Sequence, residues 1–297
     1  MAESNGRARY NGMFAVRKEA GYTSNDVVAR LRGILHMRRI GHGGTLDPDA
    51  EGVLPVCLGT GTRLVDLIAE RDKEYVALLR LGVTTDTQDL SAGARRLATV
   101  SDALVRSEVT EEKLLAALRS FTGEYDQIPP MYSAIKQGGK RLYELAREGK
   151  TVARPARRVY IYELELLSMT LPEARIRVRC GKGTYIRTLC EDIGRRLGVG
   201  GAMQHLVRTR VGIFALEDAF TLSEVEELER TGRMQEIVRS PEFFFPEAAQ
   251  MTVLPEHDFR LRNGNVLTAG QTDADRAALE RAALHGIRMY FSDGTFA

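Results

Sequence analysis

One aspartate stands in a setting that suits chemistry. Asp47 follows a glycine-rich turn in the stretch GHGGTLDPDAEGVLPVCLG, residues 41–59, and an apolar run comes directly after it. Burial beside such a run raises the pKa of a carboxyl group, whereas a nearby arginine lowers it and keeps the group charged. A charged carboxylate that is poorly solvated is a candidate nucleophile. The simpler interpretation is a turn or helix cap, and spacing alone does not decide between the two.

Three more side chains could act with this aspartate. His42 lies five residues before it, Tyr75 lies in an apolar run, and Arg187 follows the glycine loop GKG. That loop lacks the GxxxxGK[ST] spacing of a phosphate loop. The HGGT stretch resembles an oxyanion turn, but the GxSxG motif that would accompany it is missing.

A metal site is a weaker interpretation. Asp86 and Asp89 could hold a metal ion, but two acids in a threonine-rich turn more often cap the turn. The five histidines and three cysteines form no HxxxH, HxH or CxxC pair, so a zinc site is not expected. The sequence therefore predicts neither a metal nor a cofactor.

Length and composition predict an ordinary globular protein. The chain has 297 residues, of which 43% are hydrophobic and 28% are charged, enough for one large and one small domain. No apolar run approaches the ~18 residues of a membrane span. The N-terminal residues 1–12 lack the apolar centre of a signal peptide, so we expect the cytoplasm. In that compartment the odd cysteine count predicts buried, reduced thiols.

Strands and helices that would position these residues alternate along the chain. Thr23 is expected to cap a helix, with Asp26 completing a capping box. A helix is expected over 184–198 and ends near Gly198. Short apolar or alternating runs predict strands at residues 13–18, 52–59, 73–82, 175–180 and 205–214. Strands separated by single helices indicate a mixed α/β or α+β domain.

Charge is unevenly distributed. The formal net charge is only +2, yet residues 150–210 contain 13 Lys and Arg against 5 Asp and Glu. In RIRVRC, residues 175–180, three arginines share one strand face and repel each other unless an anion lies across them. A nucleic acid would supply that anion, whereas the plainer interpretation is clustering of solvated charge.

Two segments differ from the rest. Residues 123–150 contain Pro-Pro and Gly-Gly pairs and alternate basic residues with Tyr132 and Tyr143, as nucleic-acid contacts do. We expect an exposed insertion there, which ends in a short helix. From about Phe243 the NG pair at residues 263–264, which is typical of a hairpin turn, and short apolar runs predict a small β-rich domain.

Five ordered blocks carry a resemblance to a known family. The stretch GHGGTLDPDAEGVLPVCLG closely resembles the signature of bacterial tRNA pseudouridine-55 synthases of the TruB type. The blocks KEAGYTSNDVV, KEYVALLRLGVTTDTQD, QIPPMYSAIKQGGKRLYELAREG and CGKGTYIRTLCEDIGRRLG resemble it in the same order. The resemblance covers about residues 13–214 and is weaker toward the C-terminus.

The resemblance implies an α+β pseudouridine synthase fold, with a mixed, mainly antiparallel sheet flanked by helices. It implies a catalytic domain over residues 1–245, with an RNA-binding thumb at 123–150. Residues 246–297 would form a small PUA-like domain, and they look short of a final strand. The resemblance also implies that the protein isomerises the uridine at position 55 in the T-loop of tRNA, without cofactor or metal. The T-arm of tRNA would be the partner of a monomer that needs no protein partner.

The resemblance also assigns roles. Asp47 would be the nucleophile, Tyr75 would stack on the flipped base, and Arg187 would pair with the aspartate. Tyr185 and Leu206 would pack around the base, although plain core packing is the other interpretation for Tyr75 and Leu206. The resemblance further implies that three kinds of contact belong to RNA binding: His42 in the space that the base leaves, Lys18 near the site, and the thumb cations Lys136 and Arg141.

Two departures and two rival hypotheses remain. The family usually has threonine where Gly43 stands, which predicts a looser catalytic loop, and proline where Glu19 stands. A non-catalytic RNA-binding or tRNA-folding protein would explain the basic thumb, but not Asp47, Tyr75 and Arg187 together. A guide-RNA-dependent relative that modifies ribosomal RNA is disfavoured by the thumb and the short C-terminal segment.

Overall fold

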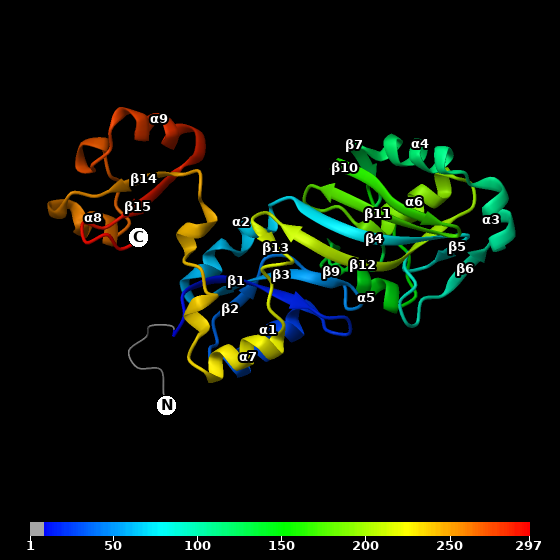
Figure 1. The fold of residues 1–297 in the computed structure, drawn as a ribbon, viewed down its shortest axis with the longest axis horizontal. Coiled ribbons are helices and arrows are strands. Elements are labelled where there is room, and N and C mark those ends of the chain that lie inside the picture. Colours follow the sequence, from blue (N-terminus) through cyan, green and yellow to red (C-terminus); the bar gives the residue numbers. More distant parts are fainter. Residues whose placement is uncertain (1–8) are drawn as a thin grey trace. The chain divides into compact units, whose positions relative to one another are not determined.

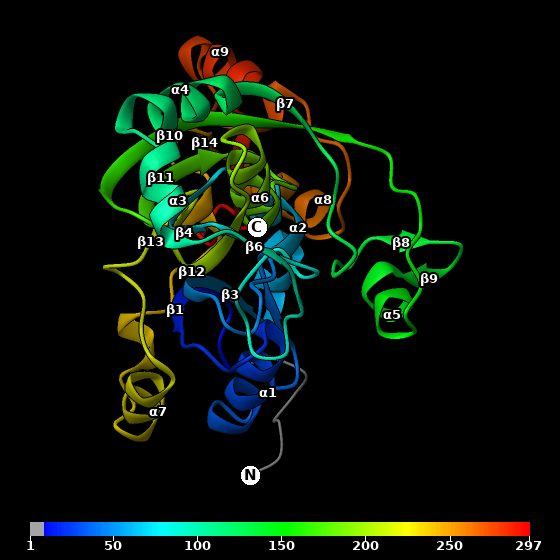
Figure 2. The ribbon, with the colours of Figure 1, turned by 90° about the vertical axis from the view of Figure 1, so that its right-hand side faces the viewer.

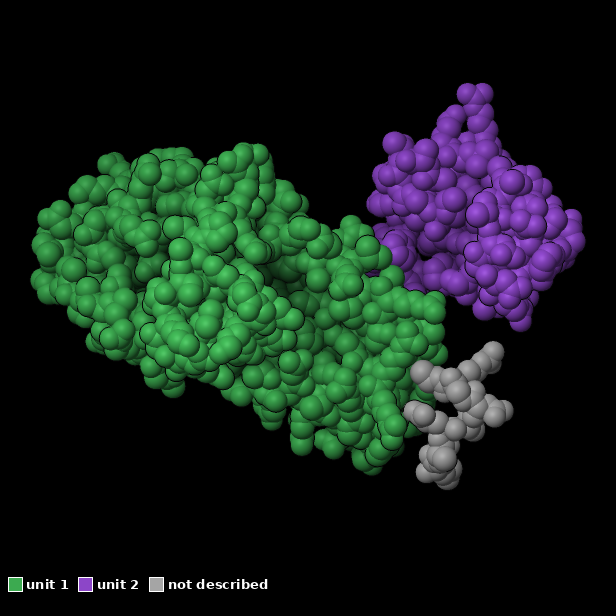
Figure 3. Space-filling model, turned by 180° about the vertical axis from the view of Figure 1, so that it is seen from behind, with its two compact units in different colours: residues 1–238 green, residues 239–297 purple. Residues whose placement is uncertain are grey.

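The computed structural model describes residues 9–297 and separates into two compact units, Met1–Val238 and Arg239–Ala297, which Figure 3 colours separately. Residues 1–8, on which most of the signal-peptide prediction depended, lie outside the described part. Every residue predicted at the active site belongs to unit 1. The two units are described one at a time.

A nine-stranded sheet forms the centre of unit 1. Its strands follow the order β1-β3-β12-β4-β11-β10-β7, with β2 added to β3 and β13 to β12. All pairs are antiparallel except β12 with β3. The predicted mixed, mainly antiparallel sheet is therefore confirmed. The strands are β1 (Gly12–Lys18), β2 (Ile40–His42), β3 (Glu51–Leu58), β4 (Lys73–Leu81), β7 (Gly123–Gln127), β10 (Arg157–Thr170), β11 (Glu173–Cys180), β12 (Gly201–Val211) and β13 (Phe214–Ala215).

Helices cover the sheet over two hydrophobic cores. One core lies between β4, β11 and β12 and helices α3, α4 and α6, and the other joins β1 and β3 to α1 and α7. Figure 1 shows these two helix groups at opposite ends of the sheet. The helices are α1 (Ser24–Ile34), α2 (Val65–Ala69), α3 (Asp102–Glu108), α4 (Glu111–Phe121), α5 (Leu142–Arg147), α6 (Ile186–Arg196) and α7 (Leu222–Arg230).

Local sequence rules explain several of these elements. The Thr23 hydroxyl accepts a hydrogen bond from the Asp26 amide at 3.0 Å, and the Asp26 carboxylate accepts one from the Thr23 amide at 2.9 Å. This is the predicted capping box, which satisfies the free amides at the start of α1. Strand β4 alternates buried and half-buried residues throughout, as a strand with one face on a core must.

A small subdomain protrudes from unit 1. It consists of the β8 (Lys136–Gln137) and β9 (Lys140–Arg141) hairpin followed by α5. Figure 2 shows it standing away from the sheet, joined to β7 and β10 by extended chain. The insertion predicted over residues 123–150 does not begin at its predicted start, because β7 pairs with β10 as an edge strand of the main sheet.

Unit 2 is small, and its buried apolar residues include Phe244, Met251 and Val253. A parallel pair of strands, β14 (Ala249–Thr252) and β15 (Ile287–Tyr290), accompanies helices α8 (Asp258–Arg262) and α9 (Arg276–His285). The Asn263-Gly264 pair, predicted as a hairpin turn, instead follows the end of α8, where Gly264 has a φ of 67°. Within residues 9–297, no helix is long and apolar enough to cross a membrane.

Candidate active site

Asp47 lies on the loop between β2 and β3, and a buried lysine holds that loop. Lys18, only 1% exposed, donates hydrogen bonds to the carbonyl oxygens of Pro48 at 2.8 Å and Ala50 at 2.6 Å. These carbonyls flank the aspartate on its C-terminal side. Lys18, predicted near the site, therefore acts on the backbone that carries Asp47, and the structure shows no ion pair between the two side chains.

The carboxylate of Asp47 is paired with Arg187 through two contacts. Arg187 Nε lies 2.9 Å from Asp47 Oδ2, and Arg187 Nη2 donates to Asp47 Oδ1 at 3.3 Å. Two parallel contacts of this kind fix the plane of the carboxylate as well as its charge. The Arg187 side chain is 6% exposed, whereas that of Asp47 is 40% exposed. One side of the carboxylate is thus fixed by the protein and another remains open to a substrate.

Further contacts fix Arg187 itself. It stands in the first turn of α6 and donates to the carbonyl oxygens of Thr87 at 3.2 Å and Tyr132 at 3.0 Å. Its Nη1 also lies 3.7 Å from Asp89 Oδ2. Asp89 was missed as a site residue because its sequence context suggested a turn cap or a metal ligand. No group of three or more acids, histidines and cysteines suited to a metal is present in residues 9–297.

The surroundings of Asp47 set its charge state. Burial raises the pKa of the Asp47 carboxyl above its ordinary value, and the carboxylates of Asp89 and Asp49 act in the same direction. Arg187, and to a lesser extent Lys18, oppose this rise by favouring the charged form. The net direction is upward, so this carboxylate is more basic than an exposed aspartate.

Tyr75 lies beside a second buried arginine. It is 7% exposed on β4 and pairs in register with Arg208 of β12. The two side chains share a hydrogen bond, and burial raises the pKa of Tyr75 to about 12. Leu206, two residues before Arg208, lies with Tyr75 and Leu46 in one hydrophobic core. The phenol is therefore neutral at ordinary pH and its ring lies against apolar side chains.

His42 and Tyr185 complete the group that the sequence predicted. His42 ends β2, and its Nδ1 is buried without a hydrogen-bond partner. Burial and the nearby charge of Arg208 lower the pKa of His42, which favours the neutral imidazole. Tyr185 precedes α6, and its backbone amide and carbonyl both bond to the side chain of Gln127, at 2.8 and 3.0 Å. The buried Gln127 was not predicted from sequence.

The remaining predicted contacts lie elsewhere. Lys136 and Arg141 face each other across the exposed β8–β9 hairpin. The Arg141 guanidinium donates to the hydroxyl of Tyr143 at 3.0 Å and lies 5.8 Å from the centre of that ring. These two cations therefore belong to the protruding subdomain, and their contacts are separate from those of Asp47.

Gly43 is a tightly packed position, whereas the predicted looseness of its loop stays a prediction. A Cβ atom added there would lie 2.3 Å from Ile68 Cγ2 and 3.5 Å from Pro55 Cβ. Its amide also donates to the Pro55 carbonyl at 2.9 Å. The buried side chain of Ile68 fills the space that a larger residue at position 43 would need.

The interpretation of the RIRVRC arginines also changes. Arg177 is paired with Glu165, and Arg179 contacts Asp72 at 3.1 Å and Glu163 at 3.4 Å. Carboxylates of neighbouring segments therefore relieve much of the repulsion along β11. A nucleic acid is not needed to neutralise these two side chains.

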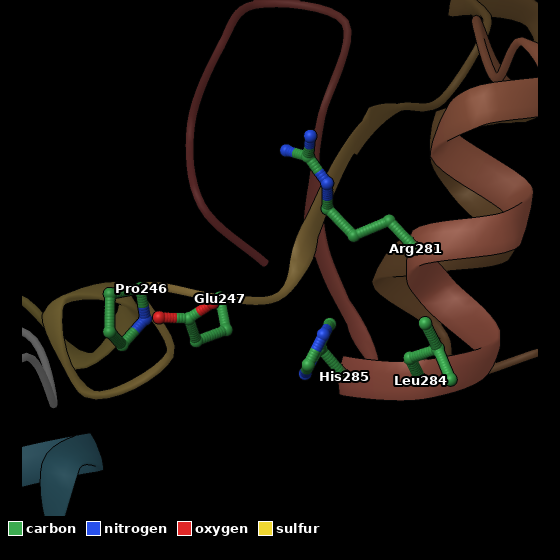
Figure 4. A pocket seen from close by; sticks show the side chains of 5 residues that line it. All are labelled: Pro246, Glu247, Arg281, Leu284 and His285. Carbon is green, nitrogen blue, oxygen red and sulfur yellow. The ribbon is translucent and has the colours of Figure 1, made fainter.

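A pocket in unit 2 involves none of the predicted site residues. Its cavity of about 430 Å³ is lined by Pro246 and Glu247 ahead of β14 and by three residues of α9 (Figure 4). Those three are Arg281, Leu284 and His285. Glu247, Arg281 and His285 bring an acid, a base and a histidine to this pocket.

Comparison with solved structures defines the class. The chain superposes on the Cbf5-Nop10-Gar1 complex structure with a TM-score of 0.69 and 26% identity, over 99% of this chain and 83% of that one. A structure described as an H/ACA RNP bound to a substrate RNA containing 2′-deoxyuridine has the same fold, with a TM-score of 0.68 and 24% identity over 99% and 83% of the two chains. The architecture is that of a pseudouridine synthase.

Sequence comparison gives the family. Residues 32–186 match the TruB family pseudouridylate synthase (N terminal domain), and residues 187–243 match the tRNA pseudouridylate synthase B C-terminal domain. The protein named tRNA pseudouridine synthase B from Lachnoclostridium phytofermentans is 44% identical over 96% of this chain and 93% of its own. One of the same name from Streptococcus pneumoniae serotype 2 is 41% identical over 91% and 92%. The chain belongs to the TruB family of pseudouridylate synthases.

Proposed function

We propose that this enzyme converts the uridine at position 55, in the T-loop of tRNA, into pseudouridine. The relatives that match over nearly the whole chain carry the name tRNA pseudouridine synthase B. The observation that carries the proposal is the pairing of a partly open Asp47 carboxylate with a buried Arg187. A binding protein has no need for a carboxylate held in this way.

The reaction needs no further reactant. The bond between N1 of uracil and C1′ of the ribose breaks, the base turns, and C5 bonds to C1′ in its place. C5 loses its proton and N1 gains one, so the atoms and electrons balance without metal or cofactor. In our proposal Asp47 is the nucleophile that assists cleavage of the first bond. Its two contacts to Arg187 keep it charged and correctly oriented.

The flipped base requires a neutral, apolar surface to lie against. The Tyr75 ring would stack on it, with Leu206 and Tyr185 packing around it. The lowered pKa of His42 supports its proposed place in the gap that the base leaves in the T-loop. A neutral imidazole enters a base stack without the cost of removing a charge from water.

The RNA would also be held outside this group. Lys136 and Arg141, both exposed on the protruding hairpin, would meet phosphates of the T-arm. The shape of the folded arm would be recognised more than its duplex sequence. We further propose that a monomer acts on bare tRNA in the cytoplasm, whereas the superposed Cbf5 structure is a complex with Nop10 and Gar1.

The test is tritium release from an unmodified tRNA transcript labelled at C5 of uridine. Purified wild type and Asp47→Asn are compared in the presence of EDTA. Release by wild type alone, with pseudouridine mapped to the T-loop uridine, supports a metal-independent synthase that requires Asp47. Tight tRNA binding without release from either protein would instead favour the RNA-binding alternative.

A further inference from the structure

Arg208 is a buried cation without an acidic partner. The side chain is 1% exposed, and within residues 9–297 it forms no ion pair with a carboxylate. Its three nitrogens instead donate to backbone carbonyl oxygens: Nε to Val53 at 2.8 Å, Nη1 to Thr45 at 3.3 Å and Nη2 to Gly44 at 3.1 Å. It also shares a hydrogen bond with Tyr75.

Such a residue is costly for folding. Removing a charge from water is unfavourable unless its hydrogen bonds are satisfied, and an apolar side chain of similar size often packs at least as well. Burial indeed lowers the pKa of the Arg208 guanidinium. The contribution that offsets this cost must therefore lie in what the side chain holds in place.

The four partners of Arg208 come from different parts of the site. Gly44 and Thr45 are the loop residues that lead to Asp47, Val53 lies on β3, and Tyr75 lies on β4. A planar guanidinium offers five donors in a rigid fork, so it fixes these groups relative to one another. A lysine at this position has a single nitrogen and cannot span them.

We propose that Arg208 is a positioning residue for pseudouridine formation, which holds the Tyr75 hydroxyl and the loop leading to Asp47 in one rigid frame. This inference rests on the proposed function. Arg208 faces Tyr75 across the β4–β12 pair and, as a donor and a nearby charge, acts on its hydroxyl. The same side chain fixes the backbone two and three residues before the nucleophile.

The test compares Arg208→Lys and Arg208→Gln with wild type. Arg210→Lys is the matched control, because it makes the same exchange two residues further along β12 at a half-buried side chain. Each protein is measured for thermal unfolding, tRNA affinity and the single-turnover rate at saturating enzyme. We expect Arg208→Lys to react roughly 10²-fold more slowly, as a small misplacement of reacting groups does. Its tRNA affinity should stay within about threefold of wild type.

A second arm asks whether Arg208 acts through Tyr75. Tyr75→Phe removes the hydroxyl and keeps the ring, and it is combined with Arg208→Lys. We expect the double variant to lose less rate than the product of the two single losses, since both changes break one unit. Losses that multiply fully would overturn the link to Tyr75.

Three other outcomes would overturn either the positioning role of Arg208 or the proposed function. A folded Arg208→Lys that reacts within about twofold of wild type overturns the proposal. If neither Arg208 variant folds, the residue serves stability and the positioning role is overturned as well. If wild type itself makes no pseudouridine, the proposed function fails, which is a different result from a normal rate in the variants.

Discussion

The surroundings of Asp47 and the protruding hairpin use charge in opposite ways. Arg187 has a side chain that is 6% exposed, and it contacts two carboxylates and two backbone carbonyls. On the hairpin side, Lys140 and Lys150 are 57% and 62% exposed, and both pair with the single carboxylate of Glu148. The first region has few charges with many partners, and the second has many charges with few partners.

This difference separates chemistry from attraction. Exposed ion pairs contribute about 0–1 kcal/mol and are screened by salt, so they define little geometry. A buried guanidinium with a full set of partners defines positions to a fraction of an ångström. We therefore expect changes near Asp47 to alter the rate of reaction, and changes on the hairpin to alter RNA affinity and its dependence on salt.

The largest effect is expected from Asp47→Asn. An amide of the same shape has no negative charge and is a poor nucleophile, so the single-turnover rate should fall by at least about a thousandfold. Affinity for tRNA and the unfolding temperature should change little, because Arg187 keeps Asp89 and two carbonyls as partners. Filter binding and calorimetry measure these two properties. A variant that binds tRNA poorly but still reacts at the normal rate would erase the contrast between the regions.

Arg187→Gln should come next, with a loss of about a hundredfold and a changed pH profile. The reaction requires ionised Asp47, so the rate rises with pH through the pKa of that group. Burial places this rise above the ordinary range for an aspartate, and Arg187 holds it down. Removing the guanidinium should therefore move the acid limb of the profile to higher pH. Single-turnover rates across a pH series give the answer, and an unshifted acid limb would contradict the pairing.

Gly43→Thr tests how rigid the loop is. The added Cβ would overlap the Ile68 side chain, so we expect a loss of about 1–3 kcal/mol in the free energy of unfolding. Combining it with Ile68→Ala should recover part of that loss relative to the sum of the two single changes. Urea denaturation measures all three proteins. A Gly43→Thr variant as stable as wild type would mean that the loop yields easily.

Much of the fold could be predicted because it follows local rules. The capping box at Thr23, the alternation of β4 and the burial of all three cysteines follow from neighbouring residues, and the structure confirms them. Asp89 and Gln127 could not be found in this way, because their roles arise from Arg187 and Tyr185, about 100 and 58 residues away. Contacts of such sequence separation leave no local signal.

Arg208 lies between these two cases, because the sequence predicts its burial but not its role. The alternation of β12 places it on the same buried face as Leu206, and a charged residue at a core-facing position is itself a signal. The sequence pattern instead favours the arginines of RIRVRC as the cations that are free to bind RNA. It does not single out Arg208 among the other arginines of the chain. Exposure and pairing decide which cations are available, and both depend on which strands become neighbours.

The smallest effects should come from the hairpin, and they distinguish free from paired cations. Within the described residues Lys136 forms no ion pair, whereas Lys140 contacts Glu148 at 2.9 Å. Replacing both Lys136 and Arg141 with alanine should weaken tRNA binding several-fold and lower the slope of log K against log salt by about 2, one unit for each phosphate that the protein no longer neutralises. Lys140→Ala is the control and should change the slope less, because Glu148 already offsets its charge. The single-turnover rate at saturating enzyme should stay normal in all of them. If it falls instead, the hairpin takes part in arranging the site, and the separation between chemistry and attraction is incomplete.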